Sequence, residues 1–355
     1  MKAIFIHGRP NAHPIHKKYA DLLNADFIYE DELLQWLELA DFFKIKRYTS
    51  WLINALFFKN KKKYNIFFCE CLRVPPFIMK KLKLLKANQK LIALMADESL
   101  YFLEKNKRGF FFNFLMKQYL NTCDYVICVG DLQYKLAIKH INRKNIKNVK
   151  IIYNTLDISY LNALINMPII INDVFKFVII GNLNTNWRSW YKGVDICFLA
   201  FKKVLENKNN KIELHVLGDV PKNIRLMLID SFSMEQINQV FFHGIVRDLT
   251  TVLNQFDLCL HVSRGDAFPT SNIECLVSGI PVIASLDTGT ANLIRLIDEK
   301  LIVNIDIDET FSAINYFLNL PKEEKIKLKE KCKMISYNFN IKHKNSFLNV
   351  INEIL

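Results

Sequence analysis

Residues 257–285 read DLCLHVSRGDAFPTSNIECLVSGIPVIAS. An apolar run is followed by a polar loop, by a stretch with helical spacing of its apolar residues and, after Gly279 and Pro281, by a second apolar run. Glycine directly after a helix and proline shortly beyond it are common helix stop signals. The segment therefore predicts a strand, a loop, a helix that begins near Thr270 and a second strand.

The same alternation of short apolar runs with helix-length amphipathic stretches extends along the whole chain, and it is typical of parallel sheets with crossover helices. The expected strands are Ala3–His7, Ile66–Cys71, Leu91–Met95, Tyr125–Val129, Val149–Ile152, Phe177–Ile180, Glu213–Leu217, Val240–Phe242, Leu258–Val262 and Pro281–Ser285. We therefore expect an α/β protein made of two doubly wound domains that face a cleft, with ligands bound beyond the carboxyl ends of the strands.

The length of 355 residues also favours two domains, because it exceeds what one hydrophobic core usually supports. We expect the boundary between Asp157 and Asp173 and place it after residue 165. This gives an N-terminal domain of residues 1–165 and a second domain of residues 166–336.

The composition indicates a folded chain and excludes a disordered one, since 51% of the residues are hydrophobic and 23% are charged. No apolar run reaches the roughly 18 residues needed to cross a bilayer, and the apolar stretch at the N-terminus is too short for a signal peptide. We therefore expect a cytoplasmic protein. The eight cysteines lack the CxxC spacing of a zinc site, and we expect them to be reduced and structural.

The net charge of +13 is concentrated in the N-terminal half. Residues 1–165 contain 27 Lys and Arg against 14 Asp and Glu, whereas residues 166–355 contain 21 of each sign. A basic half can be a solvated surface, a surface for nucleic acid or a surface that adheres to an anionic membrane. No recognised nucleic-acid-binding module accompanies the charge, and we expect no nucleic-acid partner.

Two features of residues 257–285 predict a site for an anionic ligand. Ser271 and Glu274 have the spacing of a capping box, and the N–H groups of residues 270–273 would point toward a diphosphate that the helix dipole attracts. Asp266 and Glu274 lie on either side of this anion site and could accept hydrogen bonds from sugar hydroxyls. Alternatively, Glu274 only closes the capping box and Asp266 is a solvated loop residue.

The same segment resembles the E-x7-E signature of retaining GT-B glycosyltransferases of family 4, in a version that opens with aspartate: Asp266-x7-Glu274, then Gly279-x-Pro281. The resemblance includes the turn formed by Phe268, Pro269, Thr270, Ser271 and Asn272. It implies an enzyme with a UDP-, GDP- or other nucleoside-diphosphate sugar as donor, with no other cofactor and no essential metal. It also implies that Glu274 holds the ribose, that Asp266 contacts the donor sugar, and that the turn helps to bind the nucleotide.

A second stretch with the same resemblance is FVIIGNLNTNWRSWYKGVDICFLAFKKVL, residues 177–205. A strand ends at Gly181, a polar loop follows, and Lys192 opens an amphipathic helix, which matches the family's basic residue for the donor diphosphate. Such a cation stabilises the charge that develops on the leaving group. Many relatives carry arginine where this chain has Asn182. Arg188 either supplies that second cation from the loop or faces solvent.

Other loops at the carboxyl ends of the strands carry further expected contacts. Gly8 and Arg9 match the family's glycine-containing loop that approaches donor or acceptor. The family often has a His-Asp pair where this chain has alanine followed by Asp97, which is expected to contact sugar or acceptor hydroxyls or to form a plain turn. The loop that contains Gly244 is expected to contact the nucleotide base.

The N-terminal half also offers two histidines at helical spacing, His13 and His16. Such a pair can bind a metal, but the proline between them predicts a loop and the start of a helix. We therefore expect no metal site.

The acceptor side of the resemblance is the N-terminal domain, and residues 337–355 resemble the last family helix, which packs back on that domain. Residues 42–63 and 105–120 combine aromatic residues with lysines, as interfacial helices do. The alternative is that the aromatic residues are core and the lysines solvated. A basic acceptor domain indicates a glycan, glycolipid or lipid-linked saccharide as acceptor, with peripheral membrane docking. The second hypothesis for the whole chain is a non-catalytic GT-B protein that binds a nucleotide sugar or a membrane.

Overall fold

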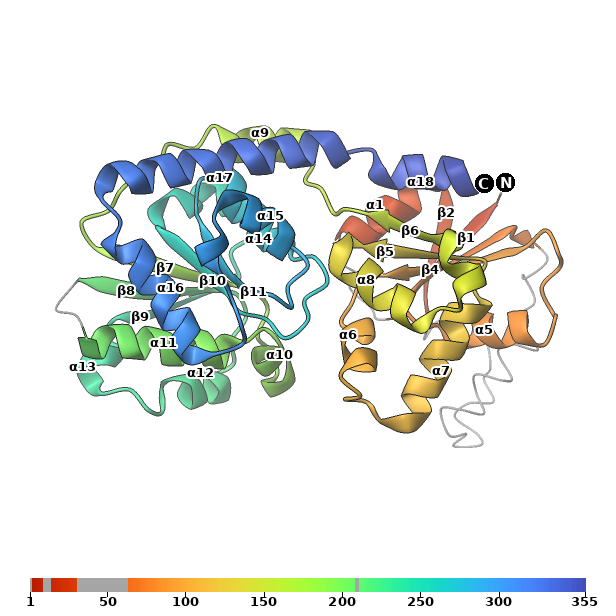
Figure 1. Cartoon of the computed structure of the whole chain (residues 1–355), viewed down its shortest axis with the longest axis horizontal. Helices are drawn as coiled ribbons and strands as arrows, with labels where there is room; N and C mark the ends of the chain where they lie inside the picture. Colours follow the sequence, from red (N-terminus) through yellow and green to blue (C-terminus); the bar gives the residue numbers. More distant parts are fainter. Residues whose placement is uncertain (1, 9–13, 31–62, 208–210) are drawn as a thin grey trace. The chain divides into compact units, whose positions relative to one another are not determined.

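The computed structural model describes residues 2–8, 14–30, 63–207 and 211–355 (Figure 1). Arg9, His13 and residues 42–62 of the first aromatic and basic stretch lie outside the described residues. The chain forms two compact units: unit 1 consists of Met1–Asn154 and Asn345–Leu355, and unit 2 of Thr155–Lys344. Within the described ranges, no helix is long and apolar enough to span a bilayer.

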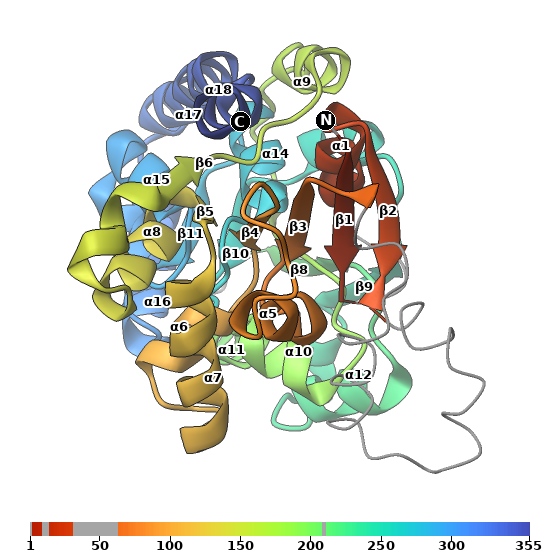
Figure 2. The ribbon, with the colours of Figure 1, turned by 90° about the vertical axis from the view of Figure 1, so that its right-hand side faces the viewer.

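Unit 1 is built on a parallel sheet with the strand order β2-β1-β3-β4-β5-β6. Its strands are β1 (Ala3–His7), β2 (Ala25–Tyr29), β3 (Ile66–Glu70), β4 (Lys90–Met95), β5 (Tyr125–Val129) and β6 (Val149–Ile152). Every strand expected in this half is confirmed, and Figure 2 shows β2, β1 and β3 side by side. The sequence did not predict β2, because all its residues are partly exposed and no buried apolar run marks it.

Among the described residues, the helices of unit 1 are α1 (Pro14–Leu22), α5 (Val74–Lys81), α6 (Ser99–Glu104), α7 (Gly109–Thr122), α8 (Gly130–His140), the 3-10 helix η2 (Arg143–Asn148) and α18 (Ser346–Ile354). Phe5, Phe67 and Phe68 of the central strands are fully buried and form part of the core. The C-terminal helix α18 joins this core through Phe347, which stacks on Tyr19 with ring centroids 4.2 Å apart. The last residues of the chain therefore complete the fold of its first residues.

Unit 2 has a second parallel sheet with the strand order β12-β11-β10-β7-β8-β9. Its strands are β7 (Phe175–Ile180), β8 (Ile212–Leu217), β9 (Val240–Gly244), β10 (Leu258–His261), β11 (Val282–Ser285) and β12 (Ile302–Val303). The expected strands are again confirmed. The short edge strand β12 has two residues, too few to give a periodic signal in the sequence.

The helices of unit 2 are α9 (Ile158–Ile165), α10 (Asn186–Tyr191), α11 (Val194–Asn207), α12 (Lys222–Ile229), α13 (Met234–Ile237), η3 (Leu249–Thr251), η4 (Leu253–Gln255), α14 (Thr270–Val277), α15 (Ala291–Ile297), η5 (Glu299–Leu301), α16 (Ile307–Asn319) and α17 (Lys322–His343). A buried ion pair ties α17 to the sheet: Lys329 Nζ lies 3.3 Å from Asp257 Oδ1, and both side chains are almost fully buried. Asp257 Oδ2 also accepts from the backbone N–H of Lys176 at 3.1 Å. The paired and hydrogen-bonded arrangement allows both charges to be buried.

The division between the units lies before residue 155, whereas the sequence placed it after residue 165. The helix α9 belongs to unit 2 because Leu161 and Leu164 are fully buried and the helix packs against α14 and α17. Within residues 337–355, the part up to His343 continues α17 in unit 2, and α18 belongs to unit 1. The segment therefore consists of two helical pieces joined by a turn at residues 344–345.

All eight cysteines are buried and free, as expected from their apolar surroundings. Burial raises the pKa of thiols such as that of Cys128, which disfavours the reactive thiolate. The cysteines therefore act as core residues.

Candidate donor-binding site

The strand order of unit 2 reverses between β7 and β10, which are neighbours in the sheet. At such a switch point the loops after the two strands diverge, and ligands bind beyond the carboxyl ends of the strands. The chain after β7 leads through α10 to Lys192, and the loop after β10 carries Asp266. Two residues singled out in the sequence therefore meet at the switch point.

Lys192 and Asp266 form an ion pair in which Nζ of the lysine donates to Oδ2 of the carboxylate, and their side chains are 18% and 13% exposed. Burial alone would favour the neutral acid. The positive charge of Lys192 outweighs this desolvation and holds the pKa of Asp266 well below its usual range. Asp266 is therefore ionised at neutral pH, and it fixes the position of the ammonium group.

Two glycines allow the loops around this ion pair to approach each other. Gly193 has a φ angle of +67°, and a Cβ atom there would lie 1.7 Å from the carbonyl oxygen of Val262. Gly289 donates its N–H to the carbonyl oxygen of Asp266 at 2.8 Å, and a Cβ on Gly289 would lie 1.6 Å from the carbonyl oxygen of Ala267. A larger residue at either position would push backbone segments apart, so the ion pair depends on both glycines.

His261 is a site residue that the sequence analysis missed. Its Nε2 atom lies 3.2 Å from Oδ2 of Asp266, and its side chain is 4% exposed. The two atoms are within ion-pair distance but are not aligned as a hydrogen bond. Burial lowers the pKa of His261 although Asp266 acts in the opposite direction, so a neutral imidazole lies against the carboxylate. A histidine inside the buried strand β10 is indistinguishable from a core residue in the sequence.

The helix α14 begins at Thr270, as expected. The predicted capping box is wrong, because the N-cap residue is Pro269 and Ser271 lies within the first turn. Proline offers no side-chain acceptor, and no side chain caps this end of the helix. The first N–H groups of α14 therefore keep their capacity to bind an anion.

The side chains of the turn before α14 hold it in place. Phe268 stacks on Phe339 of α17 with ring centroids 6.0 Å apart. Asn272 is fully buried, and its Nδ2 donates to Oγ1 of Thr290 at 2.9 Å. Both side chains therefore shape the turn from inside unit 2, and the contact that Asn272 can offer a ligand is its backbone N–H.

Glu274 lies in the second turn of α14. Desolvation raises the pKa of Glu274 to about 7, and a hydrogen bond from Tyr160 opposes this rise. Tyr160 belongs to α9, which packs against α14, and burial together with the neighbouring carboxyl group raises the pKa of its phenol. Glu274 therefore titrates near neutral pH, and Tyr160, which the sequence did not predict, positions its carboxyl group.

The loop after β7 begins with Gly181, whose N–H donates to the carbonyl oxygen of Leu217 at 3.0 Å. Arg188 of α10 donates from Nε to the carbonyl oxygen of Asn182 at 3.0 Å and is partly exposed. One guanidinium N–H thus orders the loop. The guanidinium group of Arg264 lies over the ring of Trp190 in the same helix, with its central carbon 4.7 Å from the ring centroid. This contact joins the loop after β7 to the loop after β10.

Gly244 ends β9 with a φ angle of +72°, and no heavy atom lies within 4 Å of where its Cβ would be. Its carbonyl oxygen accepts from the N–H of Gly218 at 2.7 Å. The backbone at Gly244 is therefore fixed on one side and open on the other, which suits an approach by a flat ligand such as a base.

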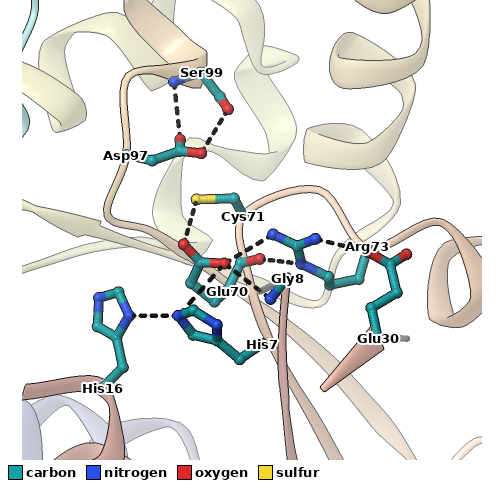
Figure 3. A network of polar contacts seen from close by, with 9 residues as sticks. All are labelled: His7, Gly8, His16, Glu30, Glu70, Cys71, Arg73, Asp97 and Ser99. Carbon is teal, nitrogen blue, oxygen red and sulfur yellow. Dashed lines mark hydrogen bonds and ion pairs between the residues drawn. The ribbon is translucent and has the colours of Figure 1, made fainter. Parts of the chain in front are cut away.

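In unit 1, Gly8 and Asp97 lie in a network of polar contacts, to which Gly8 contributes its backbone N–H (Figure 3). A Cβ on Gly8 would lie 2.2 Å from Nη2 of Arg73, so the glycine makes room for this guanidinium group. Asp97 accepts from the backbone N–H and the hydroxyl of Ser99 at 2.8 and 2.9 Å. These bonds form the plain turn, which is one of the two alternatives that the sequence left open for Asp97; the other is a contact with the acceptor.

A cavity of about 420 Å³ opens elsewhere in unit 2, lined by residues of α15, α16 and α17 such as Arg295, Tyr316 and Lys331. None of the residues singled out for donor binding lines it. The side chains at the switch point therefore define the candidate donor site.

Comparison with known proteins agrees with the resemblance seen in the sequence. Residues 174–319 match the model of a family described as Glycosyl transferases group 1. This range includes Lys192, Asp266 and Glu274. By sequence, no curated protein matches the chain.

Three solved structures are similar over nearly the whole chain. HepE from Anabaena, in complex with UDP and glucose, has a TM-score of 0.71 at 14% identity, with 99% of this chain and 100% of that chain covered. A UDP-forming α,α-trehalose-phosphate synthase from Burkholderia xenovorans has a TM-score of 0.70 at 12% identity, with 99% of each chain covered. A trehalose-6-phosphate synthase used to study glycosyltransfer with retention has a TM-score of 0.69 at 11% identity, with 98% and 99% covered. At identities this low, the structural similarity shows the fold alone. It is the GT-B fold of two Rossmann-like domains.

Proposed function

Because residues 174–319 match the model of the group 1 glycosyl transferases, we propose that the chain transfers a sugar from a nucleoside-diphosphate sugar to a hydroxyl group of a glycan or lipid-linked saccharide. The observation that carries the proposal is the Lys192–Asp266 ion pair at the switch point of unit 2, in the loop that leads to the uncapped end of α14. Cation, carboxylate and free N–H groups are the three partners that a sugar diphosphate requires. One of the similar structures is a complex with UDP and another is named a UDP-forming synthase, which favours a UDP-sugar as the donor.

In the proposed complex, Lys192 exchanges the carboxylate of Asp266 for the diphosphate. The N–H groups of residues 270–273 bind the same phosphates, and Arg188 can turn its outer guanidinium nitrogens toward them. Asp266, once released, accepts hydrogen bonds from the donor sugar, while Glu274 accepts them from the ribose. Gly181, Asn182 and Gly244 contribute backbone contacts to the nucleotide.

The proposed reaction retains the configuration at the anomeric carbon. The bond between this carbon and the diphosphate oxygen breaks, the acceptor oxygen forms a new bond on the same face, and the departing diphosphate takes the proton of the acceptor hydroxyl. Lys192 and the helix N–H groups stabilise the negative charge on the leaving group, so the step needs no metal in this proposal. The similar synthase studied for retention supports this stereochemistry.

We assign the acceptor to unit 1, where Gly8 and Asp97 would contact it, and place the reaction in the cytoplasm at an anionic membrane surface. The support is α7, on which Phe110, Phe111 and Phe114 are 86%, 58% and 51% exposed. Basic residues flank these rings: Lys105, Lys107, Arg108 and Lys117. Exposed aromatic residues next to lysines suit an interface, where each lysine contributes about 1 kcal/mol.

Vesicle sedimentation tests this membrane contact. We expect binding to anionic vesicles that weakens with salt, and loss of that binding in the double variant Phe110→Ser, Phe114→Ser. Leu296→Ser in unit 2, which removes a side chain that is 66% exposed, is the matched control and should bind like the wild type. Equal binding to zwitterionic vesicles, or unchanged binding of the double variant, would remove this part of the proposal.

The main test is release of nucleoside diphosphate from a panel of sugar nucleotides, with lipid extract as the source of acceptor. We expect one donor to be consumed by the wild type and turnover to be lost in Lys192→Ala and Glu274→Ala. Lys203→Ala is the matched control, since Lys203 pairs with Asp308 on the surface of the same unit. Nucleotide binding without turnover of any donor would instead favour the non-catalytic binding protein.

A further inference from the structure

Three side chains of unit 1 converge where the order of its sheet reverses. His7 ends β1 and Glu70 ends β3, and these two strands are neighbours at the switch point, with Ile6 paired to Cys69. His16, from the first turns of α1, points to the same place (Figure 3). All three residues are buried, and each is less than 10% exposed. The position is one where α/β sheets bind ligands.

The nitrogen atoms of the two histidines have the spacing of metal ligands. His7 Nε2 lies 3.1 Å from His16 Nδ1, and two imidazoles on one tetrahedral zinc ion, each about 2.0–2.1 Å from it, would be about 3.3 Å apart. The third group is Glu70, whose Oε2 lies 4.0 Å from the same nitrogen of His7, so a small rotation of its carboxylate completes the set. One atom from each residue falls within 4.8 Å of the others.

The charges around this group leave an excess of negative charge. Arg73 donates to Glu70 Oε2 and Glu30 Oε2, both at 2.7 Å, so one buried guanidinium group serves two buried carboxylates. Asp97 adds a third carboxylate, which lies with Glu70 and Cys71 in a second cluster of possible ligand atoms. Unbalanced buried charge is costly, and a divalent cation bound by neutral imidazoles would offset it.

The carboxylate of Glu70 is also oriented as metal ligands usually are. Its Oε2 accepts from Arg73 and, at 3.4 Å, from the backbone N–H of Gly8. Its Oε1 accepts from the thiol of Cys71 at 3.6 Å. Hydrogen bonds of this kind fix the direction of a ligating carboxylate. Two imidazoles with one carboxylate favour zinc and related transition metals over magnesium or calcium.

Unit 2 contains a second His-His-Glu group that lacks this convergence. His215 Nδ1 lies 2.9 Å from His243 Nε2, whereas Glu213 Oε2 lies 3.0 Å from the other nitrogen of His215. These three residues form a chain, in which the carboxylate and the second histidine face opposite edges of one ring. Such a chain cannot chelate one ion, and it provides an internal comparison for the group in unit 1.

We propose that His7, His16 and Glu70 bind one divalent transition-metal ion of zinc type. The site lies in unit 1 and uses none of the residues assigned to the sugar nucleotide. The proposal therefore goes beyond glycosyl transfer and stands or falls independently of it.

The test is a titration of the full chain, free of any affinity tag and stripped by a chelator, with Co²⁺ as a coloured probe for the zinc site. We expect one equivalent to bind and to give visible ligand-field absorption without a thiolate charge-transfer band. Zinc should displace the cobalt and raise the melting temperature of the wild type. Neither readout needs a donor or an acceptor.

His16→Ala and the more conservative His16→Asn should weaken cobalt binding at least about tenfold, whereas His243→Ala should leave it unchanged. Circular dichroism of each metal-free variant checks that the chain is folded. Absence of stoichiometric binding by the wild type would overturn the proposal. So would unchanged binding by both His16 variants, or a thiolate band that places the ion on Cys71.

Discussion

Glu274→Gln should stabilise unit 2 above neutral pH and change its stability little in acid. Desolvation raises the pKa of Glu274 from its ordinary value of 4.5 to about 7. The folded state therefore holds a proton that the unfolded state releases between these two values, and stability falls as the pH rises through this window. Glutamine has a similar shape and no charge, so it removes this loss.

The size of the effect follows from the shift. At 1.36 kcal/mol per pKa unit, the raised pKa of Glu274 lowers the free energy of unfolding by roughly 3 kcal/mol at pH 8 and by under about 1 kcal/mol at pH 5. The free energy of unfolding of the variant should exceed that of the wild type by those amounts. The same substitution should weaken nucleotide binding, because the proposal has the carboxylate accept hydrogen bonds from the ribose, and bonds to a charged acceptor are the stronger ones.

The assay is urea unfolding followed by tryptophan fluorescence at pH 5 and pH 8. Two of the four tryptophans, Trp187 and Trp190, lie in unit 2, and replacing Trp36 and Trp51 by phenylalanine confines the signal to that unit. This matters because a chain with two units need not unfold in one step. Equal stability differences at the two pH values, or a variant that is less stable at pH 8, would refute the reasoning about Glu274.

Three further substitutions test other contacts. Lys329→Met should cost about 3–5 kcal/mol in urea unfolding because it leaves the Asp257 carboxylate buried without its cation, and adding Asp257→Asn should restore much of the loss. His261→Leu should lower donor turnover about tenfold and shift its pH profile, whereas His261→Gln should retain more of it; equal activity of the two would argue against a positioning role. Gly193→Ala should lower both the melting temperature and the turnover, since Cβ would meet backbone 1.7 Å away; wild-type values for both would contradict the close approach.

The strands could be predicted from the sequence because those of parallel sheets are buried on both faces and read as continuous apolar runs. Residues 66–69 and 91–95 are fully or almost fully buried and show this pattern. β2 and β12 lie at sheet edges, where partial exposure or short length removes the signal. The sequence placed the boundary after residue 165 and so assigned α9 to the first domain, because the apolar face of a helix does not show which of two cores it packs against.

The site could be predicted where a local motif carries it, as for Asp266 and Glu274. The motif of residues 177–205 predicts a role for Lys192. Its pairing with the carboxylate of Asp266, 74 residues away, depends on packing around Gly193 and Gly289 and could not be predicted. Tyr160 and His261 were missed for the same reason. Each reaches the site from an element whose sequence resembles ordinary helix or core strand.

The most direct measurement is a crystal structure of the chain with UDP, or with whichever nucleoside diphosphate the donor panel releases. We expect the diphosphate to lie against the first N–H groups of α14, with Lys192 turned from Asp266 to a phosphate oxygen and the ribose hydroxyls on Glu274. A nucleotide bound elsewhere, or bound while Lys192 remains paired with Asp266, would contradict this expectation.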